Sequence, residues 1–159
     1  VYEFIDKLKI DEHSKKSLFA VGRLDKDTEG LLVITNDGKL SSILTQPNNG
    51  ILKEYYVDAE NPINKAQIKS IEKGVTIQLE EGPYTTREAH VKVIGETQIY
   101  ITITEGKKRQ IRRMMEALGN KVTFLRRTSL GNLKLGSLKK GQFRQFSREG
   151  MYGQIGLNY

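Results

Sequence analysis

Apolar and polar residues alternate along two stretches in the middle of the chain, 87–94 and 97–105. A period of two places the apolar side chains on one face of an extended segment, so both stretches are predicted to be half-buried strands. Gly95 and Glu96 stand between them. This pair predicts a hairpin turn that joins the two strands.

Two other stretches have an apolar period close to 3.6, which predicts amphipathic helices. In 63–74, Ile and Ala residues gather near one side, and Gly74 is a typical C-terminal stop. In 107–119, apolar residues form one stripe, polar residues form the opposite stripe, and Gly119 ends the pattern. The apolar stripe consists of Ile111, Met114, Met115 and Leu118, and the polar stripe of Arg109, Arg112, Arg113 and Glu116.

The remaining predicted elements are mostly strands. Strands are predicted at 31–35, 51–60, 75–79, 121–127, 133–135 and 141–146, and a brief helix at 39–46. Strands and helices mix without the regular alternation of a parallel α/β fold. The predicted fold class is therefore α+β, with a mostly antiparallel mixed sheet flanked by helices, in one domain that covers residues 1–159.

Composition narrows the class of protein. The absence of Cys excludes disulfides, zinc–thiolate sites and thiol chemistry. No apolar run approaches the roughly 20 residues that a membrane-spanning helix needs, and residues 1–16 are too charged for a signal peptide. We therefore expect no membrane partner and a location in the cytoplasm or inside an organelle. The composition does not define the oligomeric state, for which a monomer is the default expectation.

The net charge is +7, and its distribution along the chain is uneven. Residues 1–104 hold 13 basic and 16 acidic side chains, whereas residues 105–148 hold 13 basic and 2 acidic ones. Concentrated positive charge is typical of a protein with a polyanion partner, and nucleic acid is the first candidate. An anionic membrane surface, or solubility alone, are the other interpretations.

A turn rich in carboxylates follows the first part of the chain. In "GRLDKDTEGLLVIT" (22–35), Asp25, Asp27 and Glu29 stand at alternate positions. This arrangement is similar to the start of a calcium loop, but the twelfth position is an Asn where a bidentate Glu is needed. A magnesium-dependent aspartyl phosphotransferase also begins with two alternate aspartates after a strand. The simplest alternative is a turn in which Asp and Thr oxygens accept backbone N–H groups.

Three blocks of sequence together resemble one enzyme family. "GRLDKDTEGLLVITNDGKL" (22–40), "KEYYV" (53–57) and "EGKKRQIRRMMEALG" (105–119) are similar, in order, to motifs of the RsuA/RluB/RluE group of pseudouridine synthases. The tail "LGNLKLGSLKKGQFRQF" (130–146) follows the pattern of the same group. Three ordered blocks over nearly the whole chain are far more specific than any one of them. The resemblance implies the pseudouridine synthase catalytic fold.

The resemblance also implies a reaction. Uracil is detached from its ribose at the ring nitrogen, rotated and rejoined through carbon five, with no cofactor and no metal. Asp25 would be the catalytic group, acting as nucleophile or as base toward the sugar. Arg112 would form an ion pair with Asp25 and keep it ionised, whereas without the resemblance it is typical of a solvated helix face and a pair with Glu116. Tyr55 would pack against the target base, and its alternative is a strand tyrosine in the core.

Further contacts with RNA are implied by the same resemblance. Arg23 stands where related synthases insert an Arg into the vacated base stack, and its alternative is a phosphate contact or a surface charge. Asp27 and Glu29 occupy variable positions of the motif and are expected to face solvent. The other residues expected to contact the substrate are Lys53, Lys107, Lys108, Arg109, Ile111, Arg113, Arg126 and Arg127.

Members of the group usually begin with a small RNA-binding module and a strand containing K-P-x-G, and neither occurs in residues 1–159. We therefore expect this chain to be a catalytic domain. The predicted function is isomerisation of a specific uridine to pseudouridine in ribosomal RNA, with base flipping and an essential Asp. A non-catalytic RNA-binding or ribosome-associated module is the rival interpretation, and the magnesium-dependent phosphotransferase is a weaker one.

Overall fold

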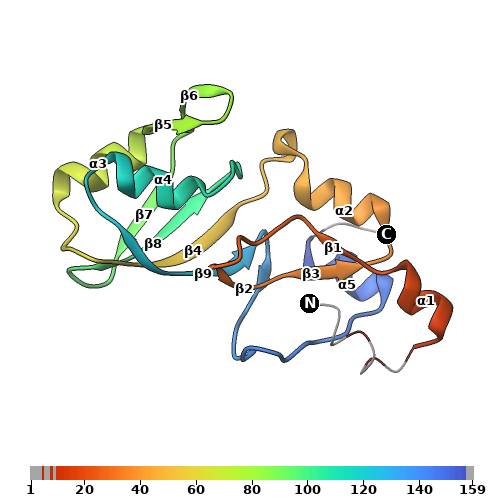
Figure 1. Cartoon of the computed structure of the whole chain (residues 1–159). Helices are drawn as coiled ribbons and strands as arrows, with labels where there is room; N and C mark the ends of the chain where they lie inside the picture. Colours follow the sequence, from red (N-terminus) through yellow and green to blue (C-terminus); the bar gives the residue numbers. More distant parts are fainter. Residues whose placement is uncertain (1–4, 6–7, 9, 157–159) are drawn as a thin grey trace.

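The computed structural model describes residue 5, residue 8 and residues 10–156. Its helices are α1 (Glu12–Ser17), α2 (Gly38–Thr45), α3 (Lys65–Lys73), α4 (Gln110–Ala117) and α5 (Arg148–Gln154), with a 3-10 turn, η2, at Pro47–Asn49. Its strands are β1 (Phe19–Val21), β2 (Glu29–Gly30), β3 (Val33–Thr35), β4 (Lys53–Ala59), β5 (Thr76–Leu79), β6 (Gly82–Thr85), β7 (His90–Val93), β8 (Gln98–Ile103), β9 (Val122–Leu130) and β10 (Leu133–Lys134). Figure 1 shows their arrangement.

The largest sheet joins strands from the middle and the last third of the chain. Its order is β10-β9-β4-β8-β7, with antiparallel neighbours throughout, and β2 adds to β9 as a parallel pair. Two small sheets stand apart from it, one formed by β1 with β3 and the other by β5 with β6. The predicted α+β class with a mostly antiparallel sheet is confirmed.

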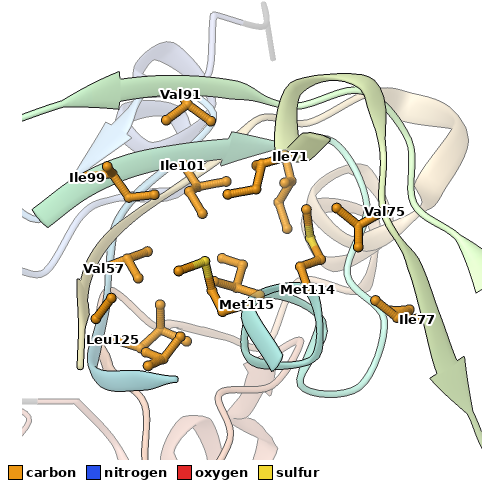
Figure 2. Packing of buried hydrophobic residues seen from close by; sticks show 14 residues of the cluster. Val57, Ile71, Val75, Ile77, Val91, Ile99, Ile101, Met114, Met115 and Leu125 are labelled. Carbon is orange, nitrogen blue, oxygen red and sulfur yellow. The ribbon is translucent and has the colours of Figure 1, made fainter. Parts of the chain in front are cut away.

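One side of the large sheet carries the larger apolar core, which α3 and α4 cover (Figure 1). The alternation in β8 buries Ile99, Ile101 and Ile103 and leaves the residues between them only partly buried. The apolar stripe of α4 meets them with Met114 and Met115, which are both fully buried (Figure 2). The two periods of the sequence therefore meet in one core.

A second, smaller core lies where β1, β3, α2 and α5 meet the ends of β9 and β10. Its buried members are Val21, Val33, Leu40, Leu44, Leu130, Leu133 and Tyr152. Because β9 contributes to both cores and also pairs with β2, the acidic turn that precedes β2 lies at the junction between the cores.

Some elements differ from those that the sequence predicts. The strand predicted at 141–146 is wrong, because these residues form no strand and are mostly exposed. The α1, β1, β6 and α5 elements were not predicted, and each is at most seven residues long, too short for a clear period. Helix α4 begins at Gln110, later than the predicted start at residue 107. The residues before it form a turn instead, in which the Lys107 N–H donates to Gln110 Oε1 (2.9 Å). Among the described residues, no helix is both long and apolar enough to span a bilayer.

Asp37 connects the two helices of the smaller core. Its carboxylate caps α2 by accepting the N–H groups of Lys39 (2.9 Å) and Leu40 (3.1 Å). It also accepts the Tyr152 hydroxyl (3.1 Å) and forms an ion pair with Arg148 (2.8 Å), both from α5. Burial acts to raise the pKa of Asp37, but these hydrogen bonds and the Arg148 charge outweigh it and lower the pKa below its usual value.

We expect Asp37→Ala to destabilise the fold by about 1 to 3 kcal/mol near neutral pH, since a helix cap and a charge-assisted hydrogen bond are both lost. A carboxyl group with a lowered pKa stabilises the folded state above its ordinary pKa of about 3.9, and this contribution is lost as the pH falls through the folded-state value. Urea unfolding should therefore show a large difference between wild type and variant near neutral pH and a small one in acid. An equal difference at both pH values would contradict this assignment.

Candidate functional site

The acidic turn is closed locally and held against β9. The Thr28 N–H donates to the Asp25 carbonyl (2.9 Å), which closes the turn. Strand β2 then pairs in parallel with β9 at Arg126 and Arg127, and the Leu31 N–H donates to the Arg127 carbonyl (2.9 Å). The turn that carries the carboxylates is thus fixed to a central strand of the sheet.

Two arginines of the α4 segment, Arg109 and Arg112, bind this turn through Asp27. Arg109 donates from both terminal nitrogens to the two carboxylate oxygens, at 2.8 and 3.1 Å. Arg112 donates to the Asp27 carbonyl (2.7 Å), and its Nε lies 3.3 Å from Asp27 Oδ2. A second donor of Arg112 reaches the Val122 carbonyl (3.1 Å). One guanidinium therefore ties the acidic turn, α4 and β9 together.

The partner of Arg112 differs from the one that the sequence predicts. The ion pair of Arg112 runs to Asp27, and within the described part of the chain no ion pair joins Arg112 to Asp25. Arg112 is also buried, at 7% exposure, so the alternative of a solvated pair with Glu116 is wrong. Alternate positions in a tight turn point in different directions, and the sequence does not say which carboxylate faces α4.

The expectation that Asp27 and Glu29 face solvent is likewise wrong in part. Asp27 is half-exposed but forms ion pairs with both Arg109 and Arg112. Glu29 forms ion pairs with Arg126 (3.3 Å) and Lys140 (3.6 Å). These pairs also argue against the calcium interpretation. Among the residues that the structure describes, no cluster of three or more His, Cys, Asp or Glu side chains could hold a metal ion.

The ion pairs of Asp27 with Arg109 and Arg112 join the turn and the α4 segment in one charge network. The hydrogen bond from Arg109 is the main reason why the pKa of Asp27 is lowered, with partial burial opposing it and Arg112 adding to it. In return the Asp27 hydrogen bond raises the pKa of Arg109, and the charge of Asp25 contributes in the same direction. Asp25, which is partly buried, therefore lies within the electrostatic reach of Arg109.

Arg109 has an unusual backbone as well as this carboxylate partner. Among the described residues it is the one non-glycine residue with positive φ, at 54°, and it stands directly before the first turn of α4. Such a conformation costs about 1 to 3 kcal/mol and persists at sites where the surrounding structure requires it. A groove runs beside it, and the residues that line the groove are Asp27, Arg109, Arg112, Glu116, Lys121, Val122 and Thr123.

Tyr55 and Tyr56 lie on opposite faces of β4, as the alternation of a strand requires. Tyr55 packs against the larger core and is paired in register with Arg127 of β9. Tyr56 contacts Tyr100 and Phe124 edge to face, with ring centroids 5.7 and 6.0 Å apart. Tyr55 is only partly buried, so it borders the core without being enclosed in it.

The residues predicted to contact RNA divide into exposed and buried groups. Arg23, Lys107, Lys108 and Arg126 are exposed, although the last three are engaged with Tyr84, Glu80 and Glu29 respectively. Arg113 is partly buried and donates to the Gln78 carbonyl. Ile111 and Arg127 are each 3% exposed. Ile111 is a member of the larger core, and Arg127 is buried and does not lie at the surface where a phosphate contact is expected from the sequence.

Glu105 is a buried carboxylate that sequence reasoning missed. It accepts the Tyr84 hydroxyl (2.5 Å), the Arg87 N–H (2.9 Å) and Gln110 Nε2 (2.8 Å). The hydrogen bond between Tyr84 and Glu105, together with burial and the charge of Glu105, raises the pKa of Tyr84. The available signal was a single acidic residue at the head of an otherwise basic block. Glu105 fixes the loop that leads into α4 and thereby the position of Arg109 and Arg112.

Comparison with known proteins yields consistent matches. The sequence profile described as RNA pseudouridylate synthase matches residues 2–117. An uncharacterized RNA pseudouridine synthase of Bacillus subtilis (strain 168), YtzG, is 41% identical over 139 residues, which are 84% of this chain and 57% of that protein. The ribosomal small subunit pseudouridine synthase A of Vibrio cholerae is 38% identical over 141 residues, 88% of this chain and 60% of that protein.

A solved structure agrees with these matches. A crystal structure of a pseudouridylate synthase superimposes with a TM-score of 0.84 and 31% identity, over 97% of this chain and 64% of the other. The chain thus spans about three fifths of the length of the relatives that it matches.

Proposed function

The chain belongs to the RNA pseudouridylate synthase family, and on that premise we propose that it isomerises a specific uridine of ribosomal RNA to pseudouridine. The N-glycosidic bond to the ring nitrogen breaks, the uracil rotates, and a new bond forms between the sugar and carbon five, which loses its proton to solvent while the freed ring nitrogen takes up a proton. The observation that carries the proposal is the contact between the acidic turn and the α4 segment. Arg109 and Arg112 bond to Asp27, which lies more than 80 positions earlier in the sequence.

We assign the reacting carboxylate to Asp25, as nucleophile or as base toward the sugar. It stands in the turn that Arg112 holds by the Asp27 carbonyl, and it contributes to the field at Arg109. In this assignment Arg112 positions the catalytic turn through Asp27, in place of the direct ion pair to Asp25 that the sequence suggested. Buried at 7% exposure and bonded to two backbone carbonyls, it is a rigid anchor for that turn.

Tyr55 is assigned to stacking on the target base, because it is the partly exposed aromatic residue that borders the larger core next to β9. Base stacking on an aromatic side chain is worth about 1 to 3 kcal/mol. The exposed cations Arg23, Lys107, Lys108 and Arg126, together with Arg109 and Arg113, are assigned to the RNA backbone or to the vacated stack, where they set the register of the strand without specifying its sequence.

The test is turnover. The 159-residue chain, in excess over unmodified ribosomal RNA labelled with tritium at carbon five of uridine, should release tritium into water to one equivalent per RNA of its target subunit. Both ribosomal RNAs are assayed, because the subunit is unassigned. Salt-dependent binding of both RNAs without any release would instead support the non-catalytic RNA-binding module, since counterion release alone does not distinguish the two functions.

A further inference from the structure

Arg127 is a buried cation without an acidic partner. It is 3% exposed, and its Nε donates to the Leu31 carbonyl (2.8 Å). Its Nη2 is buried with no hydrogen-bond partner, and within the described residues no carboxylate forms an ion pair with it. A buried charge normally requires a paired and hydrogen-bonded counterion, so an unpaired guanidinium nitrogen at this depth is costly.

Lys53 adds a second cation on the same face of the sheet. Tyr55 is in register with Arg127. Lys53 stands two residues before Tyr55 on β4, and the pairing of β4 with β8 is regular from Lys53 to Tyr55, so the two side chains point to the same side. Lys53 is partly buried and forms no ion pair within the described part of the chain. Burial lowers the pKa of Lys53, the charge of Arg127 lowers it further, and Glu105 acts against both.

The neighbouring carboxylates do not neutralise this pair. Glu105, the acidic group within electrostatic reach of Lys53, is already bonded to Tyr84, Arg87 and Gln110. Asp27 and Glu29 from the adjoining turn hold other arginines. Lys53 and Arg127 thus lie within electrostatic reach of each other, and the carboxylate that acts on Lys53 is bonded to other groups, so a further negative charge would be favourable there.

We propose that Lys53 and Arg127 form an anion site that receives a phosphate group of the RNA strand beside the flipped uridine. An ammonium and a free guanidinium N–H together suit a tetrahedral phosphate, whose oxygens accept charge-assisted hydrogen bonds. Tyr55 is the register partner of Arg127 and stands two residues from Lys53 on the same strand, so both cations neighbour it and could receive the phosphate of a base stacked on Tyr55. The RNA origin of the phosphate rests on the proposed function, whereas the anion site itself does not.

The experiment compares uridine 5′-monophosphate with uridine as ligands of the 159-residue chain, by calorimetry or NMR titration. Wild type should bind the monophosphate at least about tenfold more tightly than the nucleoside, the factor expected of one charge-assisted hydrogen bond. Lys53→Met should reduce this preference to about twofold or less. Lys92→Met, which removes an exposed lysine of β7, is the matched control and should keep the preference of wild type. Lys53 is chosen because replacing the fully buried Arg127 threatens folding.

A second arm distinguishes free phosphate from a nucleotide phosphate. Inorganic phosphate at constant ionic strength should raise the melting temperature of wild type and of Lys92→Met but not that of Lys53→Met. Equal binding of nucleotide and nucleoside by wild type, or an unchanged preference in Lys53→Met, would overturn the anion site. Neither readout requires turnover. If wild type released no tritium but still bound phosphate in a Lys53-dependent way, the isomerase proposal would be refuted and the anion site would remain supported.

Discussion

Asp25→Asn is expected to lower the rate of tritium release by about 10³-fold or more while leaving the melting temperature nearly unchanged. Loss of a general base alone costs about 10² to 10⁴-fold in rate, and loss of a nucleophile can cost more. Among the described residues, the Asp25 side chain takes part in no hydrogen bond and no ion pair, so the packing does not depend on its charge. Single-turnover release and thermal unfolding of the same preparation measure the two effects.

Asp27→Asn is the matched control, since it makes the same change two residues along in the same turn. It should lower the melting temperature together with the rate, because Asp27 holds Arg109 and Arg112. A wild-type rate in Asp25→Asn combined with an inactive Asp27→Asn would transfer the catalytic role to Asp27. The two substitutions thus separate a group that reacts from a group that positions the site.

The main core follows from the sequence because its elements have clear periods. The alternation in β8 and the 3.6-residue stripe of α4 each define one buried face, and the structure packs these faces together. The segment 141–146 had no such period. Its apolar residues, Phe143 and Phe146, are three positions apart, which is no strand alternation, and Phe143 remains 48% exposed.

The site is less predictable, because it depends on side-chain direction and on burial that only the tertiary structure determines. The motif indicated that an acidic turn and an arginine of α4 meet, but the direct partner is Asp27, which stands at a variable position of the motif. Arg126 and Arg127 look equivalent in sequence. Strand alternation exposes the first and buries the second beneath the turn at Gly30, and this difference produces the unpaired cation.

Gly30→Ala is expected to destabilise the protein by about 3 kcal/mol or more, which lowers the melting temperature by roughly 6 to 12 °C. Gly30 has φ +110°, a conformation that side chains rarely adopt, and an added Cβ would stand 2.2 Å from the Arg127 carbonyl oxygen and 2.6 Å from its nitrogen. Both contacts are with backbone, so no side-chain rotation can relieve them. The β2–β9 pairing must open, which detaches the acidic turn from the sheet, and tritium release should fall with stability.

Gly38→Ala is the appropriate control for that result. Gly38 begins α2, has no positive φ, and a Cβ there would meet no heavy atom within 4 Å. Alanine favours the helix over glycine by up to about 1 kcal/mol, so this variant should be as stable as wild type or slightly more so. If Gly30→Ala had the same melting temperature as Gly38→Ala, the close pairing of β2 with β9 would not be required for the fold. The acidic turn would then have to be held chiefly by the Arg109 and Arg112 contacts to Asp27, and the catalytic role of Asp25 would depend on α4 alone.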